Sequence, residues 1–307
     1  MNSSLIQLLN FSLGQEVVKY FSDDSVIEIM LNDDGKLWID TFDGTKDTGV
    51  IIENEKALSV AYLLASHIGA EINQDCPHLS GELPGTGFRF QIEIPPVVSN
   101  VSFNIRKKAI RVFSLNDYLE NGIITKRQKE IIEKAVAKRK NILVVGGTSS
   151  GKTTLCNAIL KEIAKYNNRV VLIEDVQELQ CETENKVRMK TSKNTTIRDL
   201  IKITMRKTPE RIIVGEIRDG AALDLLKAWN SGHPGGISTI HADDCLGGLE
   251  KLEQYIQEVS ANPQSKLIAR AIDLVVVIAK VEDQRKITEI VTVDGYENGE
   301  YILNEVV

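Results

Sequence analysis

The pattern of apolar and polar residues changes after about residue 110. Before that point, the pattern predicts two helices and four strands: helices over 2–21 and 55–70, and strands over 25–32, 36–40, 88–94 and 101–107. The first two strands enclose an acidic glycine turn, so we expect them to form a hairpin. Together these elements predict a small α+β domain over residues 1–110.

After a predicted linker over 111–124, short apolar runs alternate with amphipathic helical segments. We expect strands over 141–145, 169–175, 187–189, 209–218 and 235–241, and helices over 126–138, 154–165, 195–206 and 219–230. Three late strands follow over 272–278, 286–292 and 301–306, and the last two predict an antiparallel hairpin. Because strands that alternate with helices pair in parallel, residues 125–307 are predicted to form an α/β domain with a mostly parallel sheet.

Composition narrows the classes of protein that this chain can belong to. A length of 307 residues is typical of about two domains, and 42% hydrophobic and 26% charged residues are ordinary for a soluble globular protein. A net charge of −6 argues against affinity of the whole chain for nucleic acid, because phosphate contacts need a basic surface. No apolar run approaches the roughly 20 residues that cross a bilayer. Four scattered cysteines favour reduced thiols in the cytosol.

One segment of the second domain fits G-x-x-x-x-G-K-[ST], the phosphate-binding P-loop, and it lies between a predicted strand and a predicted helix. The candidate nucleotide-binding residues are Gly146, Gly147, Thr148, Ser149, Ser150, Gly151, Lys152, Thr153 and Thr154. Glycine lets backbone N–H groups turn towards a phosphate, and the N-terminus of the following helix favours negative charge. Lys152 is predicted to contact the β- and γ-phosphates of ATP, and the Thr153 hydroxyl to bind Mg²⁺.

Polar side chains end three other strands of the predicted sheet. Glu174 and Asp175 close one apolar strand, Glu216 closes another, and His241 closes a third. Ligands of open α/β sheets bind beyond the carboxyl ends of the strands, so we expect these groups near the P-loop. Beside a bound nucleotide, a carboxylate can hold Mg²⁺ or orient the attacking water. Glu174 and Glu216 are therefore candidates for both roles.

In the first domain, Arg89 and Arg106 occupy strand positions. Two interpretations remain open for them. They are either exposed to solvent or contact phosphates that are bound elsewhere.

Four segments together resemble those of the secretion (traffic) ATPases, in the same order: the Walker A segment 146–153, the Asp box 173–179, the Walker B segment 211–218 and the His box 232–242. The likeness continues into the first domain over 88–90, 95–98 and 103–106, and the combination is most similar to the type IV secretion and conjugation branch. The resemblance covers nearly the whole chain.

The resemblance implies a RecA-like P-loop NTPase domain, a homohexameric ring, and a nucleotide held between the two domains of each subunit. It implies that Glu216 and Glu174 activate water and support the metal, and that His241 senses the γ-phosphate. Arg89 and Arg106 are implied as phosphate contacts from the first domain.

The resemblance also suggests Arg206, Arg211 or Arg218 as arginines of the active site or of the subunit interface. One feature departs from the family pattern. Relatives often have Arg-x-Arg-Pro before the Walker B strand, whereas the second arginine is replaced here by Thr208. If that arginine closes the subunit interface in relatives, another residue such as Lys207 must do so here.

The leading hypothesis is a cytoplasmic ATPase motor that powers substrate transfer or pilus assembly in a type IV secretion or conjugation system. We expect it at the inner face of the cell membrane, held there by inner-membrane components of the machine. One alternative is a pilus assembly or retraction motor. Another is a nucleic-acid-binding module switched by ATP, although the net charge predicts no direct sequence-specific binding of nucleic acid. A nucleotide-binding structural protein without turnover is disfavoured by Glu174, Glu216 and His241.

Overall fold

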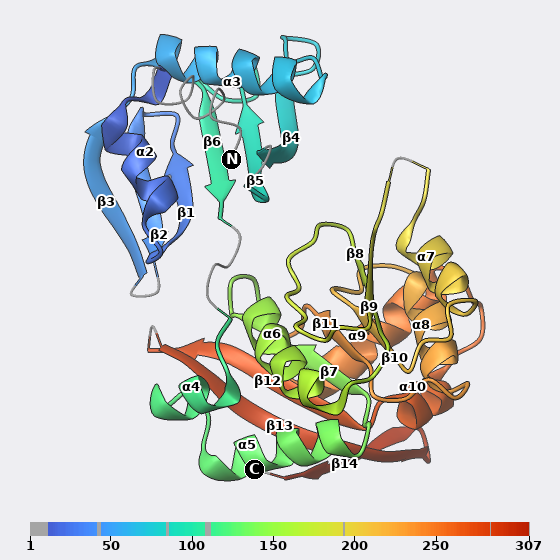
Figure 1. Cartoon of the computed structure of the whole chain (residues 1–307). Helices are drawn as coiled ribbons and strands as arrows, with labels where there is room; N and C mark the ends of the chain where they lie inside the picture. The colour runs from blue at the N-terminus through green and yellow to red at the C-terminus, as the bar shows by residue number, and fades with distance from the viewer. Residues whose placement is uncertain are drawn as a thin grey trace. The chain divides into compact units, whose positions relative to one another are not determined.

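The computed structural model describes residues 12–41, 44–83, 86–107, 112–192, 194–282 and 284–306. Contacts divide the chain into two compact units, Met1–Arg111 and Val112–Val307 (Figure 1). Among the described residues, no helix is both long and apolar enough to cross a membrane.

The first unit is built on an antiparallel sheet of order β3-β2-β1-β6-β5-β4. Its elements are α2 (Gln15–Ser22), β1 (Val26–Leu31), β2 (Lys36–Thr41), β3 (Gly44–Ile51), α3 (Asn54–Ile68), β4 (His78–Leu83), β5 (Phe88–Glu93) and β6 (Ser102–Arg106). Alternate residues of the central strands, such as Ile29 and Phe103, pack against Leu64 of α3 in one core. The predicted hairpin of β1 and β2 is confirmed.

Both edge strands of this sheet were missing from the sequence-based prediction. No residue of β3 is fully buried, and β4 buries only Leu79 and Leu83. An edge strand with one partner and few inward apolar residues has only a weak alternating pattern. The helix predicted over 2–21 is observed as α2 from Gln15 onward, and residues 1–11 lie outside the described ranges.

The second unit contains an eight-stranded mixed sheet of order β14-β13-β12-β7-β11-β10-β8-β9. Its strands are β7 (Ile142–Val145), β8 (Val170–Glu174), β9 (Lys186–Lys190), β10 (Arg211–Val214), β11 (Ile237–Ile240), β12 (Leu274–Val281), β13 (Gln284–Glu297) and β14 (Glu300–Glu305). In the order of the sheet, the six strands β12, β7, β11, β10, β8 and β9 pair in parallel. β13 and β14 are antiparallel, which confirms the late hairpin.

Helices cover both faces of this sheet (Figure 1). The helices are α4 (Leu115–Glu120), α5 (Lys126–Ala137), α6 (Lys152–Ile163), α7 (Ile197–Thr204), α8 (Ala221–Trp229), α9 (Cys245–Gln257) and α10 (Ser265–Ala271). One core joins α4, α5 and α6 to one face of the sheet, and a second core joins the helices from α7 to α10 to the other face. The second unit is therefore an α/β fold of three layers, with a mixed sheet between two layers of helices.

Part of the stretch expected to be a linker, 111–124, packs within the second unit. Leu115 and Tyr118 of α4 are buried in the same core as α6. Ser114 and Thr125 each form a capping box at the start of a helix, which satisfies the first backbone N–H groups of α4 and α5. The sequence pattern did not predict that α4 packs in this core, because polar residues around Gly122 interrupt the apolar positions.

Candidate nucleotide-binding site

The glycine loop connects β7 to α6 in the way that its motif predicts. Two residues of the loop have left-handed backbone angles, Ser149 at φ 58° and Gly151 at φ 102°. A Cβ on Gly146 would lie 2.3 Å from the carbonyl oxygen of Ile278, which excludes any side chain there. The loop therefore turns tightly against β12 and places the N-terminus of α6 at the carboxyl end of the sheet.

Lys152, the first residue of α6, has its ammonium group inside this loop. Its Nζ donates to the carbonyl oxygens of Gly146 at 2.8 Å and Gly147 at 2.7 Å. It also lies 3.1 Å from Nδ1 of His241. The residue is only 8% exposed, so the positive charge occupies the hollow where the motif predicts phosphate.

His241 joins Lys152 to the strand-end carboxylate Glu216. Its Nε2 lies 2.8 Å from Oε1 of Glu216, on the side of the ring opposite Lys152. An ammonium group can only donate, so Nδ1 must accept and the ring proton lies on Nε2, facing the carboxylate. Partial burial, and then the charge of Lys152, lower the pKa of His241 below its ordinary value. The ring is thus a neutral bridge between the two groups.

Arg218 binds the other oxygen of the same carboxylate. Its Nε donates to Oε2 of Glu216 at 2.8 Å, and its Nη2 contacts that oxygen as well. A continuous chain of contacts therefore runs from Lys152 through His241 and Glu216 to Arg218. Sequence reasoning singled out all four residues, and the structure brings them together from three separate segments.

Glu174 occupies a different environment from Glu216. It is 3% exposed, and its Oε1 accepts backbone N–H groups of Glu178 at 2.8 Å and Leu179 at 2.6 Å. Its Oε2 is buried and has no hydrogen-bond partner among the described residues. Burial raises the pKa of Glu174 to about 7, although the two N–H groups act in the opposite direction. This carboxylate fixes the turn after β8 and keeps one oxygen for a further ligand or proton.

We expect Glu174→Gln to stabilise the nucleotide-free protein at neutral pH. The pKa of Glu174 lies above its ordinary 4.5 in the folded state, so the folded protein binds the extra proton between pH 4.5 and about 7. The free energy of unfolding contributed by this group therefore falls as pH rises through that window. Gln keeps the acceptor without the buried charge. Urea unfolding should show the variant more stable by about 1 to 3 kcal/mol at about pH 8.

The control for this experiment is Glu184→Gln, which removes an exposed carboxylate of the β8–β9 connection. The stability difference between Glu174→Gln and the wild type should shrink towards zero at about pH 4.5 and below. A difference that is equal at acid and neutral pH would show that Glu174 is not a strained buried acid.

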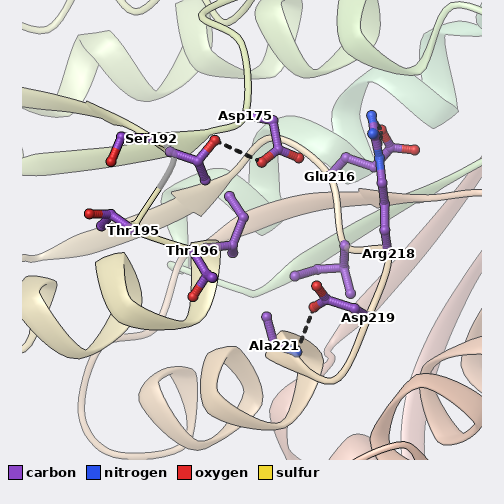
Figure 2. A pocket seen from close by; sticks show the side chains of 11 residues that line it. Asp175, Ser192, Thr195, Thr196, Glu216, Arg218, Asp219 and Ala221 are labelled. Carbon is purple, nitrogen blue, oxygen red and sulfur yellow. Dashed lines mark hydrogen bonds and ion pairs between the residues drawn. The ribbon is translucent and has the colours of Figure 1, made fainter. Parts of the chain in front are cut away.

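Beside Glu216 and Arg218 the structure contains a polar pocket of about 250 Å³. Its lining residues are Asp175, Thr191, Ser192, Thr195, Thr196, Ile197, Glu216, Ile217, Arg218, Asp219 and Ala221 (Figure 2). Asp175 accepts a hydrogen bond from the hydroxyl of Thr191 at 3.1 Å, and Asp219 accepts one from the backbone N–H of Ala221 at 2.8 Å. Three carboxylates and four hydroxyl groups are among the lining side chains, beside one arginine, so the pocket can accept a polar or cationic group.

Magnesium is a further ligand that the residues at this site fit. Within the described ranges, no group of three or more His, Cys, Asp or Glu could hold a metal ion by itself. Mg²⁺ at phosphoryl-transfer sites usually takes one or two protein ligands together with phosphate oxygens and water. Thr153 in the first turn of α6 and the orphaned oxygen of Glu174 are of the required chemical type.

The structure does not bring Arg211 to this site. Arg211 is the first residue of β10 and lies at the opposite end of the strand from Glu216. Its buried guanidinium donates to Oδ1 of Asn168 at 2.6 Å and to the carbonyl oxygens of Gly235 at 3.2 Å and Val136 at 3.0 Å. These contacts tie the amino ends of the strands together, which corrects the expectation of an active-site contact within this unit.

The other predicted arginines lie on exposed or half-buried surfaces. Arg206 follows α7 and is exposed. Arg89 and Arg106 face each other in register on β5 and β6 of the first unit, so both side chains project from one face of that sheet. The next residues in the same row are Glu82 and Glu28.

One residue that sequence reasoning missed contacts the P-loop. Nη2 of Arg285 lies 3.5 Å from the carbonyl oxygen of Ser149, and the aliphatic part of the side chain lies against Gly151. Arg285 begins a late strand and belongs to no motif. Only the pairing of β12 with both β7 and β13 brings it here, and that pairing is a matter of topology.

The fold and the loop together define the second unit as an α/β domain of the P-loop class. The chain belongs to the Type II/IV secretion system protein family, whose model matches residues 14–292.

Several relatives are similar over nearly the whole chain. The chain is 41% identical to "Probable conjugal transfer protein TrbB" of Sinorhizobium fredii, over 97% of this chain and 92% of that protein. It is 42% identical to "Conjugal transfer protein TrbB" of Rhizobium radiobacter, over 97% and 93%. Identity to "Type IV secretion system protein VirB11" of Bartonella quintana is 30%, over 94% and 96%.

Among solved structures, the ATPase DotB of Yersinia pseudotuberculosis matches with a TM-score of 0.65 at 16% identity, over 91% of this chain and 79% of that one. The pilus retraction motor PilT with bound ADP matches with a TM-score of 0.59, also at 16% identity, over 94% and 81%. These two matches concern the fold.

Proposed function

We propose that this protein is an ATPase motor that hydrolyses ATP to power substrate transfer or pilus assembly in a type IV secretion or conjugation system. The observation that carries the proposal is the contact chain from Lys152 through His241 to Glu216. It connects the group that binds phosphate to a carboxylate that can activate water. The names of the relatives that are similar over nearly the full chain, TrbB and VirB11, support the choice of machine.

In the proposed reaction, the phosphates of ATP replace the carbonyl oxygens of Gly146 and Gly147 as acceptors for Lys152. Nδ1 of His241 then no longer has to accept from Lys152, so a ring protonated at Nδ1 could donate to the γ-phosphate. Glu216 orients and polarises the attacking water, while Arg218 holds its other oxygen. Each step uses a group that is already positioned in the nucleotide-free site.

Mg²⁺ would neutralise charge that develops on the transferred phosphoryl group. We assign Thr153 as its hydroxyl ligand and Glu174 or Glu216 as the carboxylates that hold it, directly or through water. The loop from Gly146 to Thr154 would supply the backbone N–H groups for the phosphates.

We propose further that the second unit is RecA-like and that it follows a first domain over 1–110. The register pairing of Arg89 and Arg106 supports a role in binding phosphate. Two arginines side by side offer paired donors to one anionic ligand, which would share them with Glu82 and Glu28 of the same row.

The proposed assembly is a cytoplasmic homohexamer. Inner-membrane components of the machine would hold it at the inner face of the cell membrane. The transition state of phosphoryl transfer needs more positive charge than one lysine supplies, and arginine supplies it best. With Arg211 buried at the amino ends of the strands, Arg206 or Arg218 is the better candidate for a contact between subunits. The polar pocket beside Glu216 is a suitable place for such a cation to enter.

We expect the ATPase rate per subunit to fall when the protein is diluted. If a neighbouring subunit completes each site, then a dissociated subunit turns over slowly. Light scattering and phosphate release, measured over the same dilution series, should show mass and specific activity falling together. Added nucleotide should shift both curves to lower protein concentration. A monomer with constant specific activity would contradict the ring and leave a self-contained ATPase.

A further inference from the structure

The hairpin of β12 and β13 lies beside the P-loop, outside the motif itself. β12 pairs in parallel with β7 as far as Val277 opposite Val145, and it continues to Val281 after β7 has ended. β13 then returns antiparallel from Gln284. The extension therefore runs along the loop that leaves β7.

Arg285, near the start of β13, contacts this loop at two places. Its Nη2 lies 3.5 Å from the carbonyl oxygen of Ser149, at the outer limit of a hydrogen bond. A Cβ built on Gly151 would lie 3.1 Å from Cδ and 3.4 Å from Nε of Arg285. The side chain thus lies against both residues of the loop that have left-handed backbone angles.

The contact with Ser149 determines which way one peptide group of the loop faces. In a trans peptide the carbonyl group and the N–H group point in opposite directions. The carbonyl oxygen of Ser149 faces Arg285, so the N–H of Ser150 faces the interior of the loop. There it donates to the carbonyl oxygen of Gly147 over a long 3.4 Å. A phosphate oxygen in the hollow would be a better acceptor for that N–H group.

The left-handed backbone conformation of Ser149 costs free energy. A left-handed φ of 58° is unfavourable for any residue with a Cβ, so the conformation of Ser149 needs support from its surroundings. Arg285 provides a permanently charged donor at the exposed side of that peptide group. Its cross-strand partner is Lys280, which places a second positive charge on the same hairpin and provides a matched control.

We propose that Arg285 is a positioning residue of the P-loop, which holds the peptide between Ser149 and Ser150 in the orientation that binds the polyphosphate of ATP. This inference rests on the proposed function. Arg285 acts through the loop, so its effect should depend on the phosphates of the ligand and be independent of the base and the ribose.

Calorimetric binding of ATP and of inorganic triphosphate, each with Mg²⁺, tests this proposal. Arg285→Ala should weaken both ligands by a similar factor, about 5- to 20-fold, which is less than the full loss of a hydrogen bond to a charged group because Arg285 acts through the loop. Arg285→Lys keeps a donor and should recover part of the affinity. Lys280→Ala removes one positive charge from the same hairpin and should stay within about 2-fold of wild type.

Three results would overturn the proposal. Equal losses in Arg285→Ala and Lys280→Ala would mean that only the net charge of the hairpin matters. A loss for ATP without a loss for triphosphate would mean that Arg285 contacts the nucleoside. Unchanged binding of both ligands by Arg285→Ala would exclude a positioning role altogether. In contrast, a wild-type protein that binds neither ligand would overturn the proposed function, and this proposal with it.

Discussion

Lys152→Ala should abolish ATP hydrolysis and weaken ATP binding by about 10- to 100-fold, the usual range for lost hydrogen bonds to a charged group. The side chain supplies a positive charge inside the P-loop, where it now donates to Gly146 and Gly147. Without it, charge on the β- and γ-phosphates has no lysine to offset it, and the turnover should fall by at least about 10²-fold. Phosphate release and fluorescent-nucleotide titration of the purified variant measure the two effects.

The matched control for this variant is Lys165→Ala, which removes an exposed lysine just beyond the C-terminal end of α6. It should leave both binding and turnover near the wild-type values. The charge of Lys152 also lowers the pKa of His241, so that pKa should rise in Lys152→Ala. Turnover near the parent rate in Lys152→Ala would refute the assignment of the site.

Glu216→Gln should retain ATP binding and lose most of the turnover. The amide keeps the shape of the side chain and one acceptor oxygen for either Arg218 or His241, but it cannot accept a proton from water. General-base assistance typically contributes about 10²- to 10⁴-fold, and we expect the rate to fall within that range. A nucleotide titration should give a dissociation constant within a few-fold of the wild type.

The comparison with Glu174→Gln decides which carboxylate activates water. Glu174 is buried and satisfied on one oxygen by backbone N–H groups, whereas Glu216 lies beside the bridge to the P-loop. We therefore expect the smaller loss of turnover in Glu174→Gln. If Glu216→Gln hydrolyses ATP normally while Glu174→Gln is inactive, the two roles must be exchanged.

The loop and the strand-end groups were predictable because their requirements are local. Gly146 must be glycine because a Cβ there would collide with a neighbouring backbone, and that requirement is visible in the sequence. An acidic residue that ends an apolar strand is visible in the same way. What the sequence did not contain was the order of strands. β11 lies between β7 and β10, so His241 falls between Lys152 and Glu216.

The elements that sequence reasoning missed have weak or misleading local patterns. α9 carries Cys245, Leu249 and Leu252 at helical spacing, but two glycines interrupt its first turns. Gly248 is needed there, because a Cβ would lie 2.7 Å from Cγ2 of Val145. Arg285 was missed for a different reason, since only the tertiary pairing of its strand brings it to the loop.

Phosphate release from Mg²⁺-ATP by the purified wild-type chain, measured beside Glu216→Gln at saturating nucleotide, tests the central claim most directly. We expect steady multiple turnover by the wild type, about 10²-fold or more above the variant, with similar amounts of bound nucleotide in both. A wild-type protein that binds Mg²⁺-ATP but releases phosphate no faster than Glu216→Gln would contradict an ATPase motor.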